Sequence, residues 1–354
     1  MSTIWGVLDI ADRHTTVDSV GQRAVYDAVT ELVTRHNAEL AAAASVFVEA
    51  ETTDYSETYY LPAGGMLQES TRLTRPAAVK PTGSYSVAYD LRDGRDQMAW
   101  DDVAIAYMTL DQMQAALRTV LIRDQNWIRF HILRHLLNKT NATFVDEVRG
   151  SLTIRRLANS DSTNYPPVIG SSSEADDNHY LVSGYAASAI SDTNNPFVTI
   201  KAEIKEHFGD GEPVVFFNDA QTAKVEALTD FVPVSDRYVR EGASTPTLSG
   251  VLGNVPGTVK GRVNGVWAVE WSWMPANYMY GQDIMQPAPL KKRIDLPTNI
   301  PGRGMLELVA EQDEFPLMMS VWRHREGYGV GNRLNGVALE LTTDGSFDTP
   351  TTYA

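Results

Sequence analysis

The sequence predicts an α+β fold, and three observations carry that prediction. An extended, proline-punctuated segment at residues 50–107 leads directly into an amphipathic helix of about thirty residues. An apolar strand at 213–217 is followed by a helix at 220–229, which is an α/β alternation. β-prone runs at 266–273, 315–322 and 337–341 then close the chain.

The bulk composition is that of a globular protein with an acidic surface. The chain has 354 residues, of which 43% are hydrophobic and 21% charged. Its 30 basic and 45 acidic residues give a net charge of −15, which argues against avid or sequence-specific binding of nucleic acid. The absence of cysteine excludes disulfides and thiolate metal sites. Neither a signal peptide nor a membrane span is predicted, because no basic segment precedes an apolar core and no apolar run approaches twenty residues.

The first predicted element is a helix over residues 17–45. Ser19 and Gln22 have the spacing of a capping box, in which a hydroxyl and an amide side chain satisfy the first free backbone groups. Apolar side chains recur on one face of this helix, at Val25, Val29, Leu32, Val33 and Leu40.

The extended segment reads as a β-ribbon. Residues 56–61 predict a strand that stops at Pro62, and strict alternation from Gly83 predicts a second, half-buried strand. One side of this strand carries Tyr85, Val87, Tyr89 and Leu91. The other side carries Ser84, Ser86, Ala88 and Asp90. Asp93-Gly94 has the chemistry of a tight hairpin turn, after which 98–108 would return as the partner strand. A two-stranded ribbon is marginal in water, so we expect sibling copies to cover it.

The helix over 109–139 is the strongest local prediction. Thr109 and Gln112 form a second capping-box pattern. One apolar stripe runs along this helix, which we call the spine helix; Arg118, Arg123, Arg129 and Arg134 fall mostly away from it. The stripe consists of Leu110, Met113, Leu117, Val120, Leu121, Trp127, Ile128, Ile132 and Leu136.

The remaining segments give weaker signals. Residues 151–196 are rich in Ser, Asn, Asp, Gly and Pro and predict loop, with one short helix near 184–191. The runs at 315–322 and 337–341 predict a final antiparallel pair around Gly327, Gly329 and Gly331. The last residues, TTDGSFDTPTTYA, predict a frayed tail.

No pattern of residues predicts catalysis. His131 and His135 are four apart, but Ile132 stands where a zinc protease has glutamate, so we expect a helix-surface or interface pair. The glycines at 327, 329 and 331 precede a β-prone stretch and predict a hairpin or bulge, because a nucleotide loop would open a helix. Five further histidines, His14, His36, His179, His207 and His324, show no ligand spacing. We therefore predict no catalytic residue, no cofactor and no metal site, and a protein that is not an enzyme.

Basic residues on the ribbon are the local exception to an acidic chain. Arg72, Arg75, Lys80, Arg92 and Arg95 either form ordinary surface salt bridges or meet acidic groups of neighbouring subunits, where complementary charge sets register. The residues that we expect at inter-subunit contacts are Tyr59, Tyr60, Arg72, Arg75, Tyr85, Tyr89, Arg92, Arg95 and Trp100.

The order of these parts resembles the major capsid proteins of tailed bacteriophages, which have the Hong Kong 97 fold. The stretches that carry the resemblance are EPVVFFNDAQTAKVEALTD, NGVWAVEWSWMPANYMYG, PLKKRIDLP and EFPLMMSVWRHREGYGVGNRLNGVALEL. The resemblance covers nearly the whole chain and rests on architecture, since its motifs are diffuse. It implies an N-terminal arm with a helix (1–49), an extended β-hairpin loop (50–107), a peripheral domain (108–199 and 302–354) and an α/β axial domain (200–301).

The resemblance also implies a structural function. The expected protein self-assembles into pentamers and hexamers of an icosahedral phage head that encloses double-stranded DNA without sequence-specific binding. Its expected location is the virion, after assembly in the cytoplasm of a bacterial host, with no membrane. Scaffold, portal and decoration proteins are the implied partners, and Lys80 is the one lysine of the loop that could form a cross-link. The alternatives are an encapsulin-like nanocompartment and a soluble α+β hydrolase that uses Asp or Glu.

Overall fold

The computed structural model describes residues 16–20, 22–61, 83–99, 107–165, 175–234, 255–310 and 319–354, together with the single residues 67, 69 and 78. The chain divides into two compact units. Unit 1 consists of Met1–Ala44, Leu91–His131 and Arg293–Gly327, and unit 2 of Ser45–Asp90, Ile132–Lys292 and Tyr328–Ala354. No described helix has the length and hydropathy of a membrane span. Each unit gathers three separate stretches of the chain.

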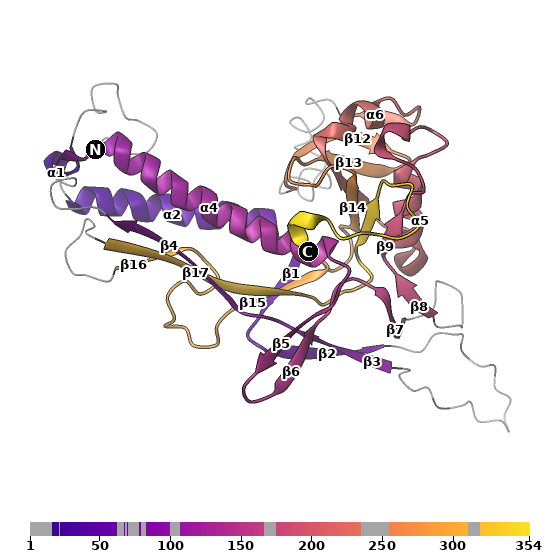
Figure 1. Ribbon diagram of the computed structural model, residues 1–354, viewed down its shortest axis with the longest axis horizontal. Helices are drawn as coiled ribbons and strands as arrows, with labels where there is room; N and C mark the ends of the chain where they lie inside the picture. Colours follow the sequence, from indigo (N-terminus) through magenta and orange to yellow (C-terminus); the bar gives the residue numbers. More distant parts are fainter. Residues whose placement is uncertain are drawn as a thin grey trace. The chain divides into compact units, whose positions relative to one another are not determined.

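Unit 1 packs two long helices against a small antiparallel sheet (Figure 1). The helices are α2, Gln22–Ala44, and the part of α4, Leu110–Leu137, that belongs to this unit. A short helix, α1, Val17–Val20, precedes α2. In the sheet, β4, Arg92–Ala99, and β16, Glu307–Ala310, both pair antiparallel with β17, Met319–Val330. The buried core joins α1, α2 and α4 to the sheet through Val17, Val25, Val29, Val33, Met98, Met113, Leu117, Val120, Leu306 and Trp322.

The start of the spine helix confirms the predicted capping box. The backbone N–H of Gln112 donates to Oγ1 of Thr109 at 3.3 Å, and the N–H of Thr109 donates to Oε1 of Gln112 at 3.1 Å. The apolar face predicted for 17–45 is also confirmed, since Val25, Val29 and Val33 are buried. The cap predicted there is wrong: Ser19 lies inside α1, where its hydroxyl donates to the carbonyl oxygen of Thr16.

The hairpin turn predicted at Asp93-Gly94 is also wrong, because both residues lie inside β4. Arg323 and Arg325 on the neighbouring strand hold the carboxylate of Asp93, at 2.8 and 3.2 Å. A Cβ on Gly94 would lie 3.2 Å from the ring of Trp127, so glycine allows the strand to pass close to the helix. The pairing with β17 outweighs the local preference of Asp-Gly for a turn.

Unit 2 is built on a seven-stranded mixed sheet in the order β11-β12-β13-β10-β14-β18-β9 (Figure 1). The strand predicted at 213–217 is its centre, β10, Pro213–Phe217, which is buried along its whole length. Helix α5, Pro196–Phe208, lies against β10, β14 and β18. The other strands are β9, Tyr180–Val182; β11, Phe231–Pro233; β12, Thr258–Val263; β13, Val266–Glu270; β14, Tyr278–Asp283; and β18, Val337–Glu340.

The close approach of α5 to the sheet depends on one glycine. A Cβ on Gly281 of β14 would lie 2.3 Å from Cγ2 of Ile200, which would force the helix away. Phe197, Ile200 and Ile204 of α5 are buried against Val215 and Phe217 of β10. The helix predicted at 220–229 is a 3₁₀ turn, Asp219–Gln221, followed by α6, Thr222–Glu226.

Smaller pairs of strands complete unit 2. They are β2, Ser56–Leu61, with β3, Gly83–Ala88; β5, Ala142–Asp146, with β6, Gly150–Ile154; β7, Asn159–Tyr165, with β8, Ala175–Asn178; and β1, Val48–Thr52, with β15, Leu290–Arg293. The prediction of loop over 151–196 is therefore wrong for β6 to β9. A 3₁₀ turn, Ala187–Ala189, stands where a short helix was predicted.

The end of the chain packs where a frayed tail was predicted. Phe347 and Tyr353 are buried, and the ring of Phe347 lies 5.1 Å from that of Tyr180. The side-chain amide of Asn138 donates to the carbonyl oxygen of Tyr353, within a last turn over Thr351–Tyr353. The predicted pairing of 315–322 with 337–341 is wrong as well, because β18 pairs with β14 and β9.

Candidate functional site

The candidate site is the root of the β2–β3 ribbon, where four tyrosines meet. The rings of Tyr59 and Tyr85 stack at 5.3 Å, and that of Tyr165 meets Tyr85 edge-on at 6.1 Å. The hydroxyls of Tyr59 and Tyr89 are 2.9 Å apart, and that of Tyr85 donates to the carbonyl oxygen of Gly331. Tyr85, Tyr89 and Tyr165 are buried. These rings bury the root of the ribbon within its own unit.

Two glycines make room for the tyrosines. A Cβ on Gly329 would lie 2.6 Å from Cδ1 of Tyr89, and one on Gly331 would lie 2.6 Å from the hydroxyl of Tyr59. The glycine-rich stretch is thus neither a nucleotide loop nor a hairpin turn. Gly329 lies within β17, and its bare backbone is the surface on which a ring of the ribbon packs.

A buried arginine supports this cluster from beneath. Arg333 is fully buried and donates to the carbonyl oxygens of Arg156 and Leu157, at 2.6 and 3.1 Å. Its guanidinium lies 3.0 Å from Oδ2 of Asp161 and 5.6 Å from the ring centre of Tyr85. Burial alone would raise the pKa of Asp161, but the hydrogen bond and charge of Arg333 outweigh it and lower that pKa to about 2.

An ion pair fixes strand β2 of the ribbon to β15. Nζ of Lys291 donates to Oε2 of Glu57 at 2.8 Å, and the hydroxyl of Tyr59 donates to the same oxygen at 3.0 Å. Burial by itself would raise the pKa of Glu57. The hydrogen bond and charge of Lys291 outweigh the effect of burial, so the pKa is lowered. The root of the ribbon is therefore held by packing and by charge together.

Beside this root, the unit exposes apolar side chains. Tyr60 of β2 is 75% exposed. In the β5–β6 hairpin, which lies next to β3 (Figure 1), Val145 is 80% and Val148 is 92% exposed. Arg149, in the turn of the same hairpin, lies 4.8 Å from the ring centre of Tyr55. We call Tyr60, Val145 and Val148 the apolar rim. Their exposure makes them candidates for contact with another molecule.

Unit 1 carries a second notable cluster, which surrounds the carboxylate of Asp124. Nε2 of His36 lies 2.9 Å from one of its oxygens, and Nδ1 of His324 lies 2.7 Å from the other. Nε2 of His324 lies 3.1 Å from Oε2 of Glu326. Asp124, His324 and Glu326 are buried. The cluster joins α2, α4 and β17, three elements far apart in sequence.

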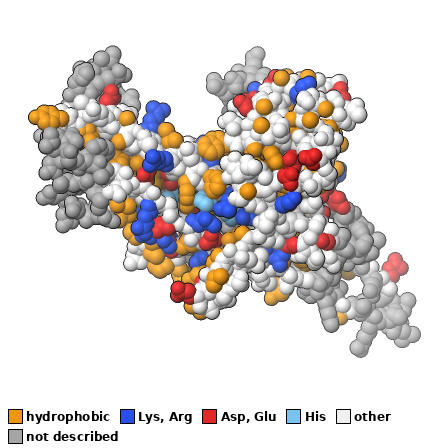
Figure 2. Space-filling view, in the orientation of Figure 1, with side chains coloured by type: hydrophobic (Ala, Val, Ile, Leu, Met, Phe, Trp, Pro, Cys, Tyr) orange, Lys and Arg blue, Asp and Glu red, His pale blue; other side chains and the backbone are white. Residues whose placement is uncertain are grey.

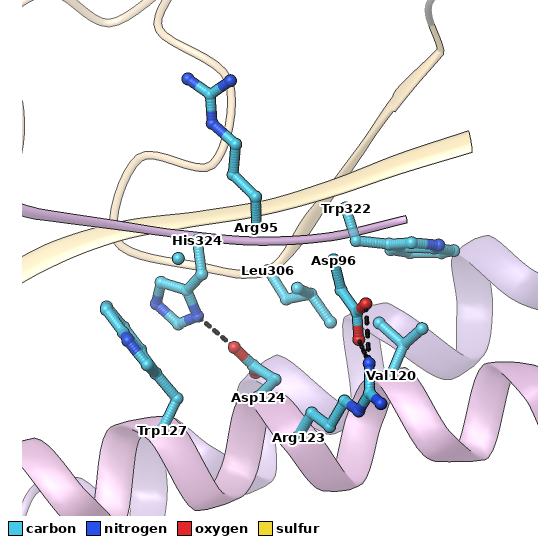
Figure 3. A pocket seen from close by; sticks show the side chains of 10 residues that line it. Arg95, Asp96, Val120, Arg123, Asp124, Trp127, Leu306, Trp322 and His324 are labelled. Atoms are coloured by element: carbon cyan, nitrogen blue, oxygen red, sulfur yellow. Dashed lines mark hydrogen bonds and ion pairs between the residues drawn. The ribbon is translucent and has the colours of Figure 1, made fainter. Parts of the chain in front are cut away.

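A cavity of about 280 Å³ lies beside this cluster, lined by Trp127, His324, Trp322 and Arg123 among others. Figure 3 shows His324 joined to Asp124 by a hydrogen bond at the cavity wall, and Arg123 reaching Asp96, at 3.0 Å to both oxygens. Burial would lower the pKa of His324, but Glu326 and Asp124 outweigh it and raise that pKa to about 9. His324 is thus charged at neutral pH. Of the charged groups that line the cavity in the described part of the chain, Arg123 pairs with Asp96, His324 with Asp124, and Arg95 with Asp93.

The structure places the predicted contact residues in three groups. Arg72, Arg75 and Trp100 lie outside the described residues, as does Lys80. Tyr85 and Tyr89 are buried within the chain, which corrects the expectation that their side chains meet a neighbour, and Tyr59 is half-buried. Tyr60 is exposed.

Arg92 and Arg95 belong with Tyr60 to the third group, whose side chains are exposed. They lie on the surface of unit 1. Arg95 has a side chain that is 58% exposed and bonds Asp93 at 2.8 Å. Arg92 is exposed as well. On the face drawn in Figure 2, basic side chains lie over α4 and the strands beside it. These basic side chains are paired in part with acidic ones, Arg95 with Asp93 and Arg123 with Asp96.

Sequence reasoning also misplaced two histidines of the spine helix. His131 and His135 are buried, at 6% and 5% exposure, where a surface pair was expected. The ring of His131 packs against Trp127, at 4.7 Å, and that of His135 lies 6.1 Å from Tyr328. Sequence reasoning missed Asp124, because its partners are distant along the chain. The sequence signal for Asp124 was its position as a lone acidic residue on the apolar side of the spine helix.

The fold is that of the Hong Kong 97-type capsid proteins. It is an α+β fold with a spine helix, an extended loop and a central α/β sheet. A structure of Mycobacterium phage Patience matches with a TM-score of 0.68 at 17% identity, over 96% of this chain and 94% of that chain. The fold assignment rests on this match.

Two further structures match at lower similarity. The mature capsid of bacteriophage PhiM1 gives a TM-score of 0.49 at 10% identity, over 84% of this chain and 86% of that chain. The capsid of a native GTA particle gives 0.48 at 11% identity, over 85% and 90%. No protein-family model and no curated protein matches the sequence.

Proposed function

We propose that this chain is a major capsid protein, which self-assembles into the pentamers and hexamers of an icosahedral phage head enclosing double-stranded DNA. The observation that carries the proposal is the match to a phage structure with a TM-score of 0.68 across 96% of the chain. A fold shared over almost the whole length leaves little of this chain for a separate catalytic domain. The proposed location is the virion, after assembly in the host cytoplasm.

The surface of the chain fits this function. The exposed side chains of the apolar rim are ones that copies of the chain would bury on assembly, and closed symmetry multiplies each weak contact many times. Tyr60, Arg92 and Arg95 remain our proposed contact residues among those described, with Arg72, Arg75 and Trp100 from the rest of the loop. A net charge of −15 keeps packaged DNA from adhering to the shell.

Other parts of the proposal come from the resemblance alone. The peripheral domain (108–199 and 302–354) and the axial domain (200–301) would be the parts that meet their copies around the symmetry axes. Scaffold, portal and decoration proteins would join the assembly in separate steps. An encapsulin-like shell is the alternative that shares the fold and differs in what it encloses.

Size-exclusion chromatography and negative-stain microscopy of the purified full chain, at rising concentration, test the proposal. We expect closed particles of tens of nanometres that show five- and six-fold clusters. A chain that stays monomeric at every concentration would overturn the proposal. Particles that enclose protein cargo and exclude DNA when isolated from the natural host would replace the phage head with a nanocompartment.

A further inference from the structure

Three side chains of unit 2 converge on one point outside the tyrosine cluster. Asp177 lies in β8, His179 follows that strand, and His207 lies in the last turn of α5. Nε2 of His179 lies 3.2 Å from Nε2 of His207 and 3.3 Å from Oδ2 of Asp177. Nε2 of His207 lies 2.6 Å from the same oxygen. The three ligand-type atoms are therefore near neighbours of one another.

The convergence point is shielded, yet open on one side. The side chain of His179 is fully buried and that of His207 is 7% exposed, whereas that of Asp177 is 22% exposed. The two imidazole ring centres are 5.1 Å apart, whereas their Nε2 atoms are only 3.2 Å apart, so the two nitrogens converge on one place. An ion could thus enter past the carboxylate and reach nitrogens that packing has already oriented.

The hydrogen bond on the far side of His179 fixes which of its nitrogens carries a proton. Nδ1 lies 2.7 Å from the carbonyl oxygen of Gly336, which can only accept, so Nδ1 is the donor. In the neutral ring Nε2 is then a bare lone pair directed at His207 and Asp177. A histidine whose other nitrogen donates to a backbone carbonyl is the arrangement found around protein-bound zinc.

Nε2 of His179, Nε2 of His207 and Oδ2 of Asp177 are the three polar atoms that meet at this point, and each can offer a lone pair to a cation. A cation at the centre would satisfy all three atoms at once.

The spacing suits a small tetrahedral ion. Zinc bound at roughly 2.0–2.2 Å to nitrogen and oxygen ligands places those ligands about 3.3 Å apart. The separations of 3.2 and 3.3 Å already match, and the separation of 2.6 Å would need to lengthen. The partly exposed side chain of Asp177 is the one that can move. We propose that Asp177, His179 and His207 form a binding site for one zinc ion, with water at the fourth position.

This assignment revises the sequence-based prediction of no metal site. His179 and His207 are 28 positions apart, and only the packing of α5 beside the end of β8 brings them together. A bound ion would tie the segment 177–179 to α5, and so stabilise unit 2. The inference does not depend on the proposed function.

Equilibrium dialysis of the untagged full chain, stripped with a chelator and then exposed to zinc chloride, tests the site. We expect one zinc per chain by elemental analysis and a rise in the midpoint of thermal unfolding. His207→Gln and Asp177→Asn should each weaken zinc binding at least about tenfold. Co²⁺ in place of zinc should give the visible absorption of a tetrahedral site in the wild-type chain, and not in His207→Gln or Asp177→Asn.

The matched control is His36→Gln, which removes an imidazole that also bonds a carboxylate, in the other unit. It should bind zinc as the wild type does. Circular dichroism of each variant establishes that it is folded. Absence of stoichiometric zinc in the folded wild-type chain, or equal uptake by His207→Gln, would overturn the site and leave a hydrogen-bonded triad.

Discussion

Nδ1 of His324 on β17 lies 2.7 Å from Oδ1 of Asp124 on α4, and the same carboxylate holds His36 of α2 through its other oxygen. One buried carboxylate thus links three elements that are distant along the chain. Because the pKa of His324 is raised, the stability that this link contributes depends on pH.

We expect the stability of the unassembled chain to fall as pH rises from about 6.5 to 9. The pKa of His324 is raised from 6.5 to about 9, so its contribution is complete below 6.5 and lost as pH rises through 9. The size of the loss is on the order of 3 kcal/mol. Urea unfolding across this range measures it, and His324→Gln should flatten the curve. A wild-type stability that stays level or rises would contradict the prediction.

Replacing Arg333 by Met should destabilise the chain strongly. The substitution removes the buried guanidinium from two backbone carbonyls and from Asp161, which keeps Arg155 and Asn141, a loss of about 3 kcal/mol. Arg35→Met is the control, because that side chain is 65% exposed and pairs with Glu31 on the helix surface. It should change stability by less than about 1 kcal/mol. Similar urea midpoints for the two variants would show that the Arg333 network carries little stability.

Gly329→Ala should loosen the root of the ribbon. The added methyl group would lie 2.6 Å from the ring of Tyr89, which is fully buried and has little room to move. We expect a loss of about 1–3 kcal/mol in thermal unfolding. Gly345→Ala has no atom within 4 Å of the added carbon and should be close to neutral. An unchanged midpoint for Gly329→Ala would mean that the ribbon adjusts freely.

The double variant Val145→Ser, Val148→Ser should separate folding from assembly. Both side chains are exposed, so the free energy of unfolding should change by no more than about 0.5 kcal/mol each. If the apolar rim is buried between subunits, particle yield in sedimentation should fall sharply. Val198→Ser, 49% exposed on α5, is the matched control. Normal particle yield from the double variant would remove the rim from the contact surface.

Local rules predicted the elements whose determinants are adjacent in sequence. The spine helix begins at its capping box because Thr109 and Gln112 need only each other. The apolar run of β10 could belong only to a buried strand. The partners of the strands were harder to predict from sequence. Strand β3 pairs with β2, although Asp93-Gly94 favoured a partner at 98–108. The charges that hold Asp93 in β4 lie 230 residues further along the chain.

The candidate site shows the same limit. Alternation predicted that Tyr85 and Tyr89 share one side of a half-buried strand, and they do. It could not predict that Gly329 and Gly331 provide the surface for that side, so these tyrosines were expected at a neighbouring subunit. The case for assembly consequently rests on the shared fold and the apolar rim, because the root of the ribbon is covered within its own unit.

The buried phenols at the root give the protein an intrinsic optical signal. Burial raises the pKa of Tyr85 to about 12, and burial with the neighbouring hydroxyl of Tyr59 raises that of Tyr89 further. In moderately alkaline buffer these rings stay un-ionised for as long as they remain enclosed. Ultraviolet phenolate absorbance that develops late in a titration would therefore report, without any added dye, the moment at which the ribbon detaches from its base.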